Sequence, residues 1–280
     1  KGQIKALDGV SLSVKEGDFV GIMGPSGSGK STLLNMIGTV DTPSKGAVYL
    51  DGENIRELRE GKIAEFRYKN IGFIFQEFNL LDNLTLRENI SVPLVLDGIS
   101  KDVIKDKVDK MSKKLGIEDQ MDKYPQECSG GQRQRIGIAR TLALNPKFIV
   151  CDEPISALDV SIQAQVINLL EKIQNEMGIA YLFIAHDLSM VKHISDRIGV
   201  MYLGNMVEIG DADDIYHEPL HPYTQALLSS VPIPDPKVAR NKKRIVLEGE
   251  LPSPINPPSG CVFRTRCPKA TERCAQEKPA

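Results

Sequence analysis

The sequence lacks the features that mark secreted, membrane-spanning and nucleic-acid-binding proteins. Its five cysteines in 280 residues are too few for a disulfide scaffold. No apolar run approaches the length of about 18 residues that a membrane-spanning helix needs. The net charge of −2 provides no electrostatic basis for binding a nucleic-acid backbone. We therefore expect a globular protein of a reducing compartment with no nucleic-acid partner.

The chain also opens without a signal peptide or an initiator methionine, beginning Lys1-Gly2-Gln3. We therefore expect further residues upstream. Hydrophobic residues make up 41% of the chain and charged residues 26%, as in ordinary globular proteins. This length allows a core in one large domain or in two smaller ones.

The most specific motif is a phosphate-binding loop that fits the pattern G-x-x-x-x-G-K-[ST]. An apolar run over residues 19–23 leads into it as a buried strand, and apolar residues from Leu33 onward continue it as a helix. Glycines let the backbone curl around an anion, and the helix N-terminus favours the same charge. Lys30 is expected to reach the β- and γ-phosphates of a nucleoside triphosphate, and Ser31 to ligate Mg²⁺. The predicted ATP-binding residues are Gly24, Pro25, Ser26, Gly27, Ser28, Gly29, Lys30, Ser31 and Thr32.

Segments of strand length alternate with helical segments along the rest of the chain. Strands are predicted over residues 5–23, 46–52, 71–75, 148–151 and 181–185. Helices are predicted within 79–126, from the segment 128–135 towards 144, and over 162–177. The alternation, with polar residues at strand ends, predicts an α/β fold with a mainly parallel sheet.

A change in composition near residue 217 suggests how the chain is organised. We predict a nucleotide-binding domain over 1–217, with a helical subdomain at about 77–135. An accessory region rich in proline and containing cysteine follows over 218–280. Within the helical subdomain, an apolar stripe is expected to pack into the core; its residues are Val103, Ile104, Val108, Met111 and Leu115.

Over about residues 5–215 the sequence resembles the ATP-binding-cassette (ABC) ATPases. The motifs that carry the resemblance, besides the phosphate loop, are the Q-loop glutamine Gln76, the signature Ser129-Gly-Gly-Gln132, the second nucleotide motif 148–152 followed by Glu153, the D-loop 156–159 and the switch histidine His186. The resemblance implies a P-loop NTPase fold with a mainly parallel sheet, an antiparallel β subdomain and a helical subdomain. It implies ATP and Mg²⁺ as the bound species.

The resemblance also assigns roles in catalysis. Asp152 would hold Mg²⁺, and Gln76 would complete its coordination. Glu153 would act as the general base for the attacking water. His186 would contact the γ-phosphate and orient that water.

The signature implies a second nucleotide contact. Two adjacent glycines before a helix form an anion site, yet one chain needs only one phosphate cradle. In the family, two ATPase domains sandwich two ATP molecules, and each signature caps the other domain's phosphate loop. The partner is an identical chain or a related one. The residues implied in this contact are Ser129, Gly130, Gly131, Gln132 and Asp159.

The two halves of the chain resemble different ABC subfamilies. From about residue 126 the sequence is similar to the ATPases of oligopeptide and dipeptide permeases, through segments such as 129–140, 221–227 and 248–274. Residues 23–38 and 71–94 are more similar to lipoprotein-release and macrolide- or peptide-antibiotic-efflux ATPases. A natural intermediate and a recombined hybrid both fit this division. Because an accessory region is specific to a subfamily, peptide uptake is the leading hypothesis and efflux or lipoprotein release the second.

Three cysteines of the accessory region, Cys261, Cys267 and Cys274, resemble a [4Fe–4S] ligand set of peptide-permease ATPases. Thiolates are the usual ligands of such clusters. The fourth ligand would lie beyond Ala280. Free thiols and a zinc site are the alternatives.

The implied protein is an ATP-hydrolysing subunit bound to the cytoplasmic face of a membrane through permease subunits. A second ATPase subunit and an extracytoplasmic peptide-binding protein are its other expected partners. A soluble ABC protein acting on ribosomes or DNA is a different class of hypothesis. Such proteins usually carry two cassettes or a long coiled-coil insertion, and neither occurs in this sequence. A phosphate-loop kinase would leave the signature without a role.

Overall fold

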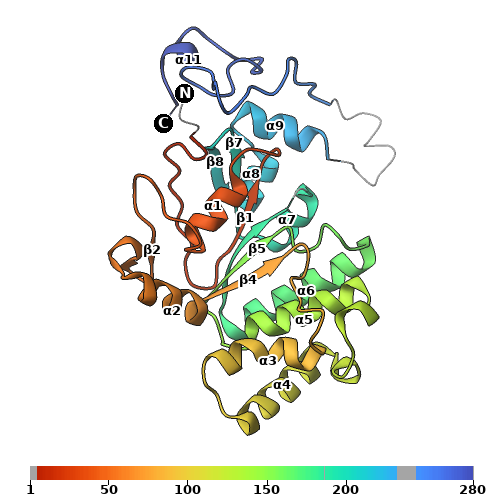
Figure 1. Ribbon diagram of the computed structural model, residues 1–280. Helices are drawn as coiled ribbons and strands as arrows, with labels where there is room; N and C mark the ends of the chain where they lie inside the picture. The colour runs from red at the N-terminus through yellow and green to blue at the C-terminus, as the bar shows by residue number, and fades with distance from the viewer. Residues whose placement is uncertain (1–4, 186, 232–243, 280) are drawn as a thin grey trace. The chain divides into compact units, whose positions relative to one another are not determined.

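The computed structural model describes residues 5–185, 187–231 and 244–279 (Figure 1). Its contacts divide the chain into two compact units. Unit 1 comprises Lys1–Val14, Phe19–Leu33 and Ile184–Ala280, and unit 2 comprises Lys15–Asp18 and Leu34–Phe183. The accessory region thus belongs to the same unit as the first strand, and the predicted domain boundary at residue 217 stays a prediction.

Unit 1 contains the strands β1 (Phe19–Met23), β7 (Arg197–Tyr202) and β8 (Asn205–Asp211). β1 pairs in parallel with β7, and β7 pairs antiparallel with β8. Every residue of β1 is buried, as expected for an apolar strand covered on both faces. The helices of this unit are α7 (Leu188–Ile194), α8 (Ala212–His217), α9 (Pro222–Ser229) and α11 (Arg273–Gln276), and α1 (Lys30–Ile37) begins in it.

The strand predicted over residues 5–23 forms only at its end, as β1. The described residues 5–14 contain no strand, and their backbone groups bond to other partners. The Asp8 N–H donates to the Gly204 carbonyl at 2.7 Å, and Arg197 Nη1 donates to the Ser13 carbonyl at 2.8 Å. The prediction for 5–14 was wrong because these residues bond to a loop residue and to a side chain and form no ladder of backbone hydrogen bonds with a strand.

Unit 2 contains the parallel pair β4 (Ile71–Phe75) and β5 (Phe148–Asp152), in which Phe75 lies opposite Asp152. β6 (Ala180–Ile184) is buried throughout. The short strands β2 (Tyr49–Leu50) and β3 (Glu53–Asn54) form an antiparallel pair. The P-loop α/β fold, with its mainly parallel strands and small antiparallel part, is confirmed.

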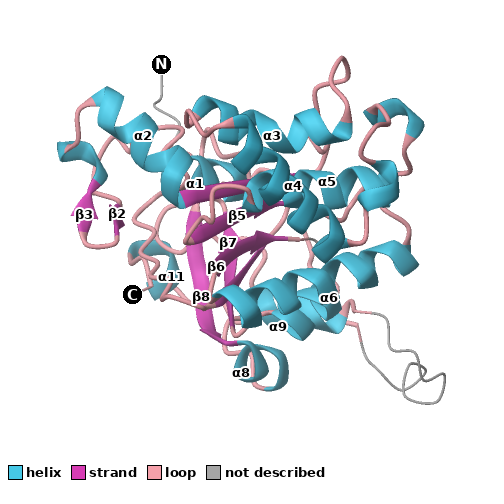
Figure 2. Cartoon of the chain, turned by 90° about the horizontal axis from the view of Figure 1, so that it is seen from below, coloured by secondary structure: helices cyan, strands magenta, loops and turns pink. Residues whose placement is uncertain are grey.

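The helices of unit 2 include the predicted helical subdomain, and Figure 2 shows α3, α4 and α5 packed close together. The helices are α2 (Glu60–Asn70), α3 (Leu86–Leu96), α4 (Lys101–Leu115), α5 (Gly130–Leu142) and α6 (Val160–Met177), with 3₁₀ turns η1 (Ile55–Glu57), η2 (Glu118–Gln120) and η3 (Pro125–Glu127). In α4, Ile104, Val108 and Leu115 are buried as predicted. Val103 is 46% exposed, because one residue corresponds to about 100° of rotation around the helix and Val103 therefore points away from the face that these three residues share.

An aromatic cluster attaches the accessory region to β7 within unit 1. Phe263 is fully buried, and its ring centroid lies 5.2 Å from that of Tyr202 and 5.4 Å from that of Tyr223. The Tyr202 and Phe263 rings meet edge to face, a favoured aromatic geometry. Phe263 is therefore the apolar anchor of a segment whose other apolar side chains, such as Val246 and Ile255, are exposed.

We predict that Phe263→Ala lowers the free energy of unfolding by about 3 kcal/mol, because it removes a fully buried ring and leaves a cavity. Urea unfolding monitored by circular dichroism measures this loss. The control is Ile255→Ala: this side chain is 57% exposed, and a change within about 0.5 kcal/mol is expected. Equal effects of the two substitutions would contradict the anchoring role.

Candidate functional site

The phosphate loop connects β1 to α1 and contains two glycines, Gly24 and Gly29, whose positions leave no space for a side chain. Gly24 has φ 148° and Gly29 has φ 99°, in the region that favours glycine. A Cβ at Gly24 would lie 2.2 Å from the Met201 carbonyl oxygen, and one at Gly29 would lie 2.6 Å from the Ala6 carbonyl oxygen. The loop is therefore fixed by main chain packed directly against it.

Lys30 folds back over this loop. Its side chain is buried, and its Nζ donates to the Gly24 and Pro25 carbonyl oxygens at 3.0 Å each. The Ser28 hydroxyl is buried without a hydrogen-bond partner among the described residues. Ser31, in the first turn of α1, is exposed. The ammonium group thus lies against the loop predicted to hold phosphates, where the loop carbonyls satisfy it.

Unit 2 brings together three of the predicted catalytic and metal-binding residues. Asp152 ends β5, Glu153 follows it, and Gln76 follows the paired strand β4. Because β4 and β5 are parallel with Phe75 opposite Asp152, Gln76 and Glu153 leave the same edge of this pair. Carboxylate and amide oxygens at one edge form a donor set suited to Mg²⁺.

Glu153 adopts a left-handed backbone conformation, with φ 48°. For a residue with a Cβ this conformation costs about 1 kcal/mol or more. The turn is held because Ser156 donates to the Glu153 carbonyl through its N–H at 3.2 Å and its hydroxyl at 2.9 Å. Strain at a predicted catalytic residue is a feature that the sequence pattern did not reveal.

The signature forms the N-terminus of α5. Ser129 is the N-cap: its hydroxyl accepts from the Gln132 N–H at 3.3 Å, and Gln132 Oε1 accepts from the Ser129 N–H at 2.9 Å. The two side chains thereby satisfy each other's backbone donors. Gly131 packs against α6, where its Cβ would lie 2.6 Å from Ile162 Cγ2.

Asp159 is the N-cap of α6 and is exposed. Its carboxylate accepts from the Ser161 hydroxyl at 2.8 Å and from the Ile162 N–H at 3.0 Å. These two bonds, that of Ser161 first, hold the pKa of Asp159 below its usual value. Gln163 fixes the preceding loop by donating to the Ile155 and Leu158 carbonyl oxygens at 3.0 Å each.

Sequence reasoning missed Gln134, a fully buried residue in the middle of α5. Its Nε2 donates to the Pro154 carbonyl at 2.6 Å, one residue beyond Glu153. The signature helix is thus bonded to the turn that carries the predicted base. A polar residue on the apolar face of this helix was the available signal.

The predicted site residues are divided between the two units. The phosphate loop belongs to unit 1, whereas Gln76, Asp152, Glu153 and the signature belong to unit 2. His186 lies outside the described residues. In the described ranges, no helix is long and apolar enough to cross a membrane.

The predicted metal site of the accessory region, at its three cysteines, finds no support among the described residues. The Cys261 N–H donates to the Cys274 carbonyl at 2.8 Å. However, the described part of the chain contains no group of three or more His, Cys, Asp or Glu side chains arranged to hold a metal ion. The predicted [4Fe–4S] cluster therefore stays a prediction.

Comparison with known families gives two matches. The family described as "ABC transporter" matches residues 7–156, and the family described as "Oligopeptide/dipeptide transporter, C-terminal region" matches residues 207–274. The second match begins within β8 and includes residues 218–274 of the predicted accessory region.

Individual relatives match both halves of the chain. The putative oligopeptide transport ATP-binding protein YkfD of Bacillus subtilis is 53% identical over 100% of this chain and 86% of its own length. The oligopeptide transport ATP-binding protein OppF of Salmonella typhimurium is 53% identical over 99% of this chain and 84% of its own. These matches include the segments 23–38 and 71–94, for which the sequence suggested release or efflux ATPases.

Solved structures agree with this classification. The ATP-binding cassette MJ0796, in a dimeric post-hydrolysis state bound to ADP and Pi, matches with a TM-score of 0.68 and 37% identity. The match covers 74% of this chain and 90% of that one.

We predict that Gly131→Ala destabilises the protein by about 1 to 3 kcal/mol, because the new Cβ would overlap Ile162. Thermal and urea unfolding measure the loss. Gly61→Ala in α2 is the control: its Cβ would meet nothing within 4 Å, so better helix propensity should leave the protein as stable or more stable. If Ile162 is the cause, the penalty should shrink when Gly131→Ala is made in an Ile162→Ala background. An unchanged penalty there would contradict this explanation.

Proposed function

The chain belongs to the ABC transporter family, and from this membership we propose that it is the ATP-hydrolysing subunit of a peptide transporter. The observation that carries the proposal is the match to oligopeptide transport ATP-binding proteins at 53% identity over 99% or more of the chain. The match of residues 207–274 to a C-terminal region of oligopeptide and dipeptide transporters supports it. Efflux or lipoprotein release is less favoured, because the peptide-transport relatives also match the segments that suggested it.

Under this proposal the phosphate loop binds ATP, and Lys30 exchanges its two loop carbonyls for phosphate oxygens. Burial of the ammonium strengthens its attraction to the triphosphate. Asp152 and Gln76 offer carboxylate and amide oxygens, which fit Mg²⁺. Ser31 is proposed as a further Mg²⁺ ligand from the family resemblance alone. The ion, when bound, would neutralise charge on the phosphoryl group.

Glu153 is proposed as the general base that takes a proton from the water attacking the γ-phosphorus. Ser156 fixes the main-chain carbonyl of Glu153 by two hydrogen bonds. The backbone from which the Glu153 side chain extends is therefore held in place while the carboxylate accepts the proton. His186 is proposed, from the family resemblance, to orient the same water.

The capped N-terminus of α5 is proposed to bind the nucleotide of a second ATPase subunit. Its backbone donors and dipole favour phosphate, and the glycines keep this surface free of side chains. Asp159, exposed at the start of α6, would lie at the same subunit interface. Closing on ATP and opening after hydrolysis would transmit work to permease subunits at the cytoplasmic face of the membrane.

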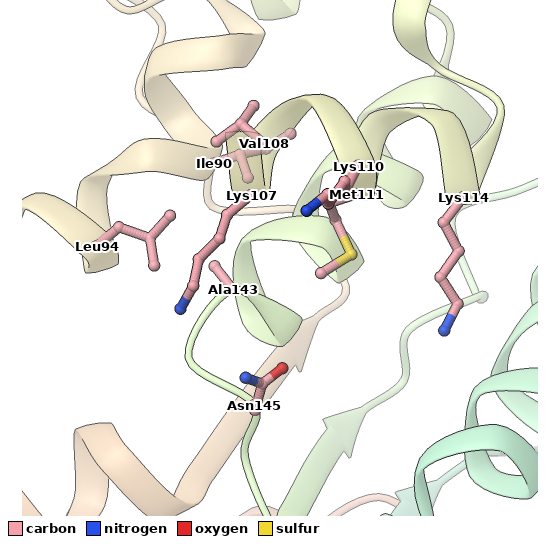
Figure 3. A pocket seen from close by; sticks show the side chains of 9 residues that line it. All are labelled: Ile90, Leu94, Lys107, Val108, Lys110, Met111, Lys114, Ala143 and Asn145. Atoms are coloured by element: carbon pink, nitrogen blue, oxygen red, sulfur yellow. The ribbon is translucent and has the colours of Figure 1, made fainter. Parts of the chain in front are cut away.

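We also propose that the helical subdomain contacts the permease through a pocket of 210 Å³ (Figure 3). Its apolar floor includes Leu94 and Met111, and the side chains of Lys107, Lys110 and Lys114 surround it. This combination suits an apolar side chain flanked by carboxylates. An extracytoplasmic peptide-binding protein would deliver the substrate.

Within the described residues, two of these lysines already form ion pairs. Lys110 pairs with Asp106 at 2.7 Å, and Lys114 pairs with Glu176 at 2.6 Å. Lys107 has no ion-pair partner in the described ranges. It is therefore the charge of this pocket that is best placed to meet a permease carboxylate.

We predict that Glu153→Gln retains ATP binding, dimerises more stably and lowers ATP turnover by a factor of about 10² or more, because the amide cannot accept the proton. Phosphate release, nucleotide binding and size-exclusion chromatography measure the three properties. Turnover equal to that of the wild type would exclude Glu153 as the base.

Peptide transport is tested with this variant as the control. The chain is co-expressed with the membrane subunits and binding protein of a peptide permease, and uptake of labelled peptide into vesicles is measured. We expect ATP-dependent uptake that Glu153→Gln abolishes. ATPase activity without uptake would contradict the peptide-transport proposal.

We predict that Lys107→Glu lowers peptide uptake several-fold and leaves the ATPase activity of the isolated chain unchanged, because it places a negative charge where permease carboxylates would dock. Lys105→Glu is the matched control, since Lys105 is exposed on the same helix and does not line the pocket. Equal uptake by the two variants would argue against docking at this pocket.

A further inference from the structure

The loop that follows Gln76 has a strained backbone. Two successive non-glycine residues lie in the left-handed region of backbone conformation: Phe78, with φ 60°, and Asn79, with φ 48°. Local bonds support it in part: the Asn79 N–H donates to the Glu77 carbonyl at 2.6 Å, and the Phe78 N–H donates to the Phe75 carbonyl at 3.4 Å. A conformation of this kind persists only where surrounding groups hold it.

Arg140, in the last turn of α5, is the residue that holds this loop in its conformation. Its Nη1 donates to the Asn79 carbonyl at 2.6 Å, and its Nη2 donates to the Phe78 carbonyl at 3.1 Å. One planar guanidinium thus binds the carbonyls of both left-handed residues. Burial lowers the pKa of Arg140, so this contact is partly shielded from water.

A second arginine of α5 contacts the same loop. The Arg133 guanidinium lies 5.0 Å from the centroid of the Phe78 ring, at cation–π distance. Residues 133 and 140 are seven apart, about two helical turns, so they share one face of α5. That face therefore holds the Gln76 loop by its backbone and by its aromatic side chain.

We propose that Arg140 is a positioning residue. By binding the carbonyls of Phe78 and Asn79, it fixes the position of the loop that follows Gln76 relative to the signature helix α5. The same helix begins at Ser129 and bonds, through Gln134, to the turn that carries Glu153. One rigid element would then fix three predicted parts of the ATPase site relative to one another. This inference rests on the proposed function in one respect, the assignment of Gln76 to Mg²⁺.

The test compares Arg140→Ala with Arg135→Ala. Arg135 is the matched control, because it also lies in α5 and donates two hydrogen bonds, to the Leu115 carbonyl at 2.9 Å and to Gln165 Oε1 at 3.1 Å, away from the loop. Hydrogen exchange is measured on the isolated full chain. In Arg140→Ala the amides of residues 76–81 should exchange about tenfold faster or more, the factor expected on losing a charged hydrogen bond. In Arg135→Ala they should exchange as in the wild type.

Activity provides a second readout. The Mg²⁺ concentration for half-maximal ATPase activity should rise several-fold in Arg140→Ala and stay unchanged in Arg135→Ala. If Arg140 acts through Gln76, the double variant with Gln76→Ala should show no further rise. Arg140→Lys keeps the charge and loses the planar guanidinium, so its Mg²⁺ concentration for half-maximal activity should lie between those of the wild type and Arg140→Ala. If Arg140→Ala does not fold, Arg140→Lys replaces it in both measurements.

The outcomes separate this inference from the proposed function. Equal exchange of residues 76–81 in Arg140→Ala and Arg135→Ala would overturn the positioning role. If Gln76→Ala leaves the Mg²⁺ requirement unchanged, the metal role of Gln76 fails, while faster exchange in Arg140→Ala would still support positioning. Additive effects of Gln76→Ala and Arg140→Ala would show that Arg140 does not act through Gln76.

Discussion

The close approach of neighbouring groups to glycines is the constraint on which both the phosphate loop and the signature depend. In the phosphate loop, Gly24 and Gly29 lie against the carbonyls of Met201 and Ala6, with no space for a Cβ. In the signature, Gly131 lies against the side chain of Ile162 in α6, again with no space for a Cβ. Backbone donors can converge on a phosphate only if no side chain stands between them. Both segments are therefore shaped by the elements packed behind them.

Within unit 2, the helix α5 contains the signature glycines and is hydrogen-bonded to other segments that carry predicted site residues. Its N-terminus is capped by Ser129 and Gln132, and its buried Gln134 bonds to the carbonyl of Pro154. Towards its C-terminus, the Thr141 hydroxyl donates to the Phe73 carbonyl of β4 at 2.7 Å. A single helix thereby bonds to the strand that leads to Gln76 and to the turn that follows Asp152. Its hydrogen bonds reach segments that are far apart in the sequence.

The sequence correctly predicted those helices and strands whose residue pattern has a single physical cause. β4, β5 and β6 are continuous apolar runs because they are buried, and α6 ends where Gly178 adopts φ 65°. The alternating residues 5–14 were misassigned, because the pattern does not distinguish a strand from an extended segment bonded to a loop. Val103 was assigned to the core because residues 103 and 104 are both apolar, whereas only one of them can point along the buried stripe.

Other features follow from contacts distant in sequence and leave no local pattern. The left-handed conformation of Glu153 is held by Ser156, and that of Phe78 and Asn79 by Arg140, yet none of these three residues is a glycine. The spacing of Cys261, Cys267 and Cys274 suggested a shared metal, but spacing does not determine whether thiols converge. The motif residues were located by sequence, and their strain and supporting bonds required the structure.

The anchor of the accessory region packs against a tyrosine whose chain neighbour bonds to the phosphate loop. Tyr202, which packs against Phe263, is two residues before Gly204, whose N–H donates to the Ser28 carbonyl at 2.9 Å. An accessory segment docked on this tyrosine and an anion bound in the loop thus act on one short stretch of main chain. Thermodynamic linkage makes any such coupling reciprocal: if docking of the segment alters nucleotide affinity, nucleotide must alter the docking equilibrium by the same factor. The C-terminal region would then sense the occupancy of the ATP site as well as mark a transporter subfamily.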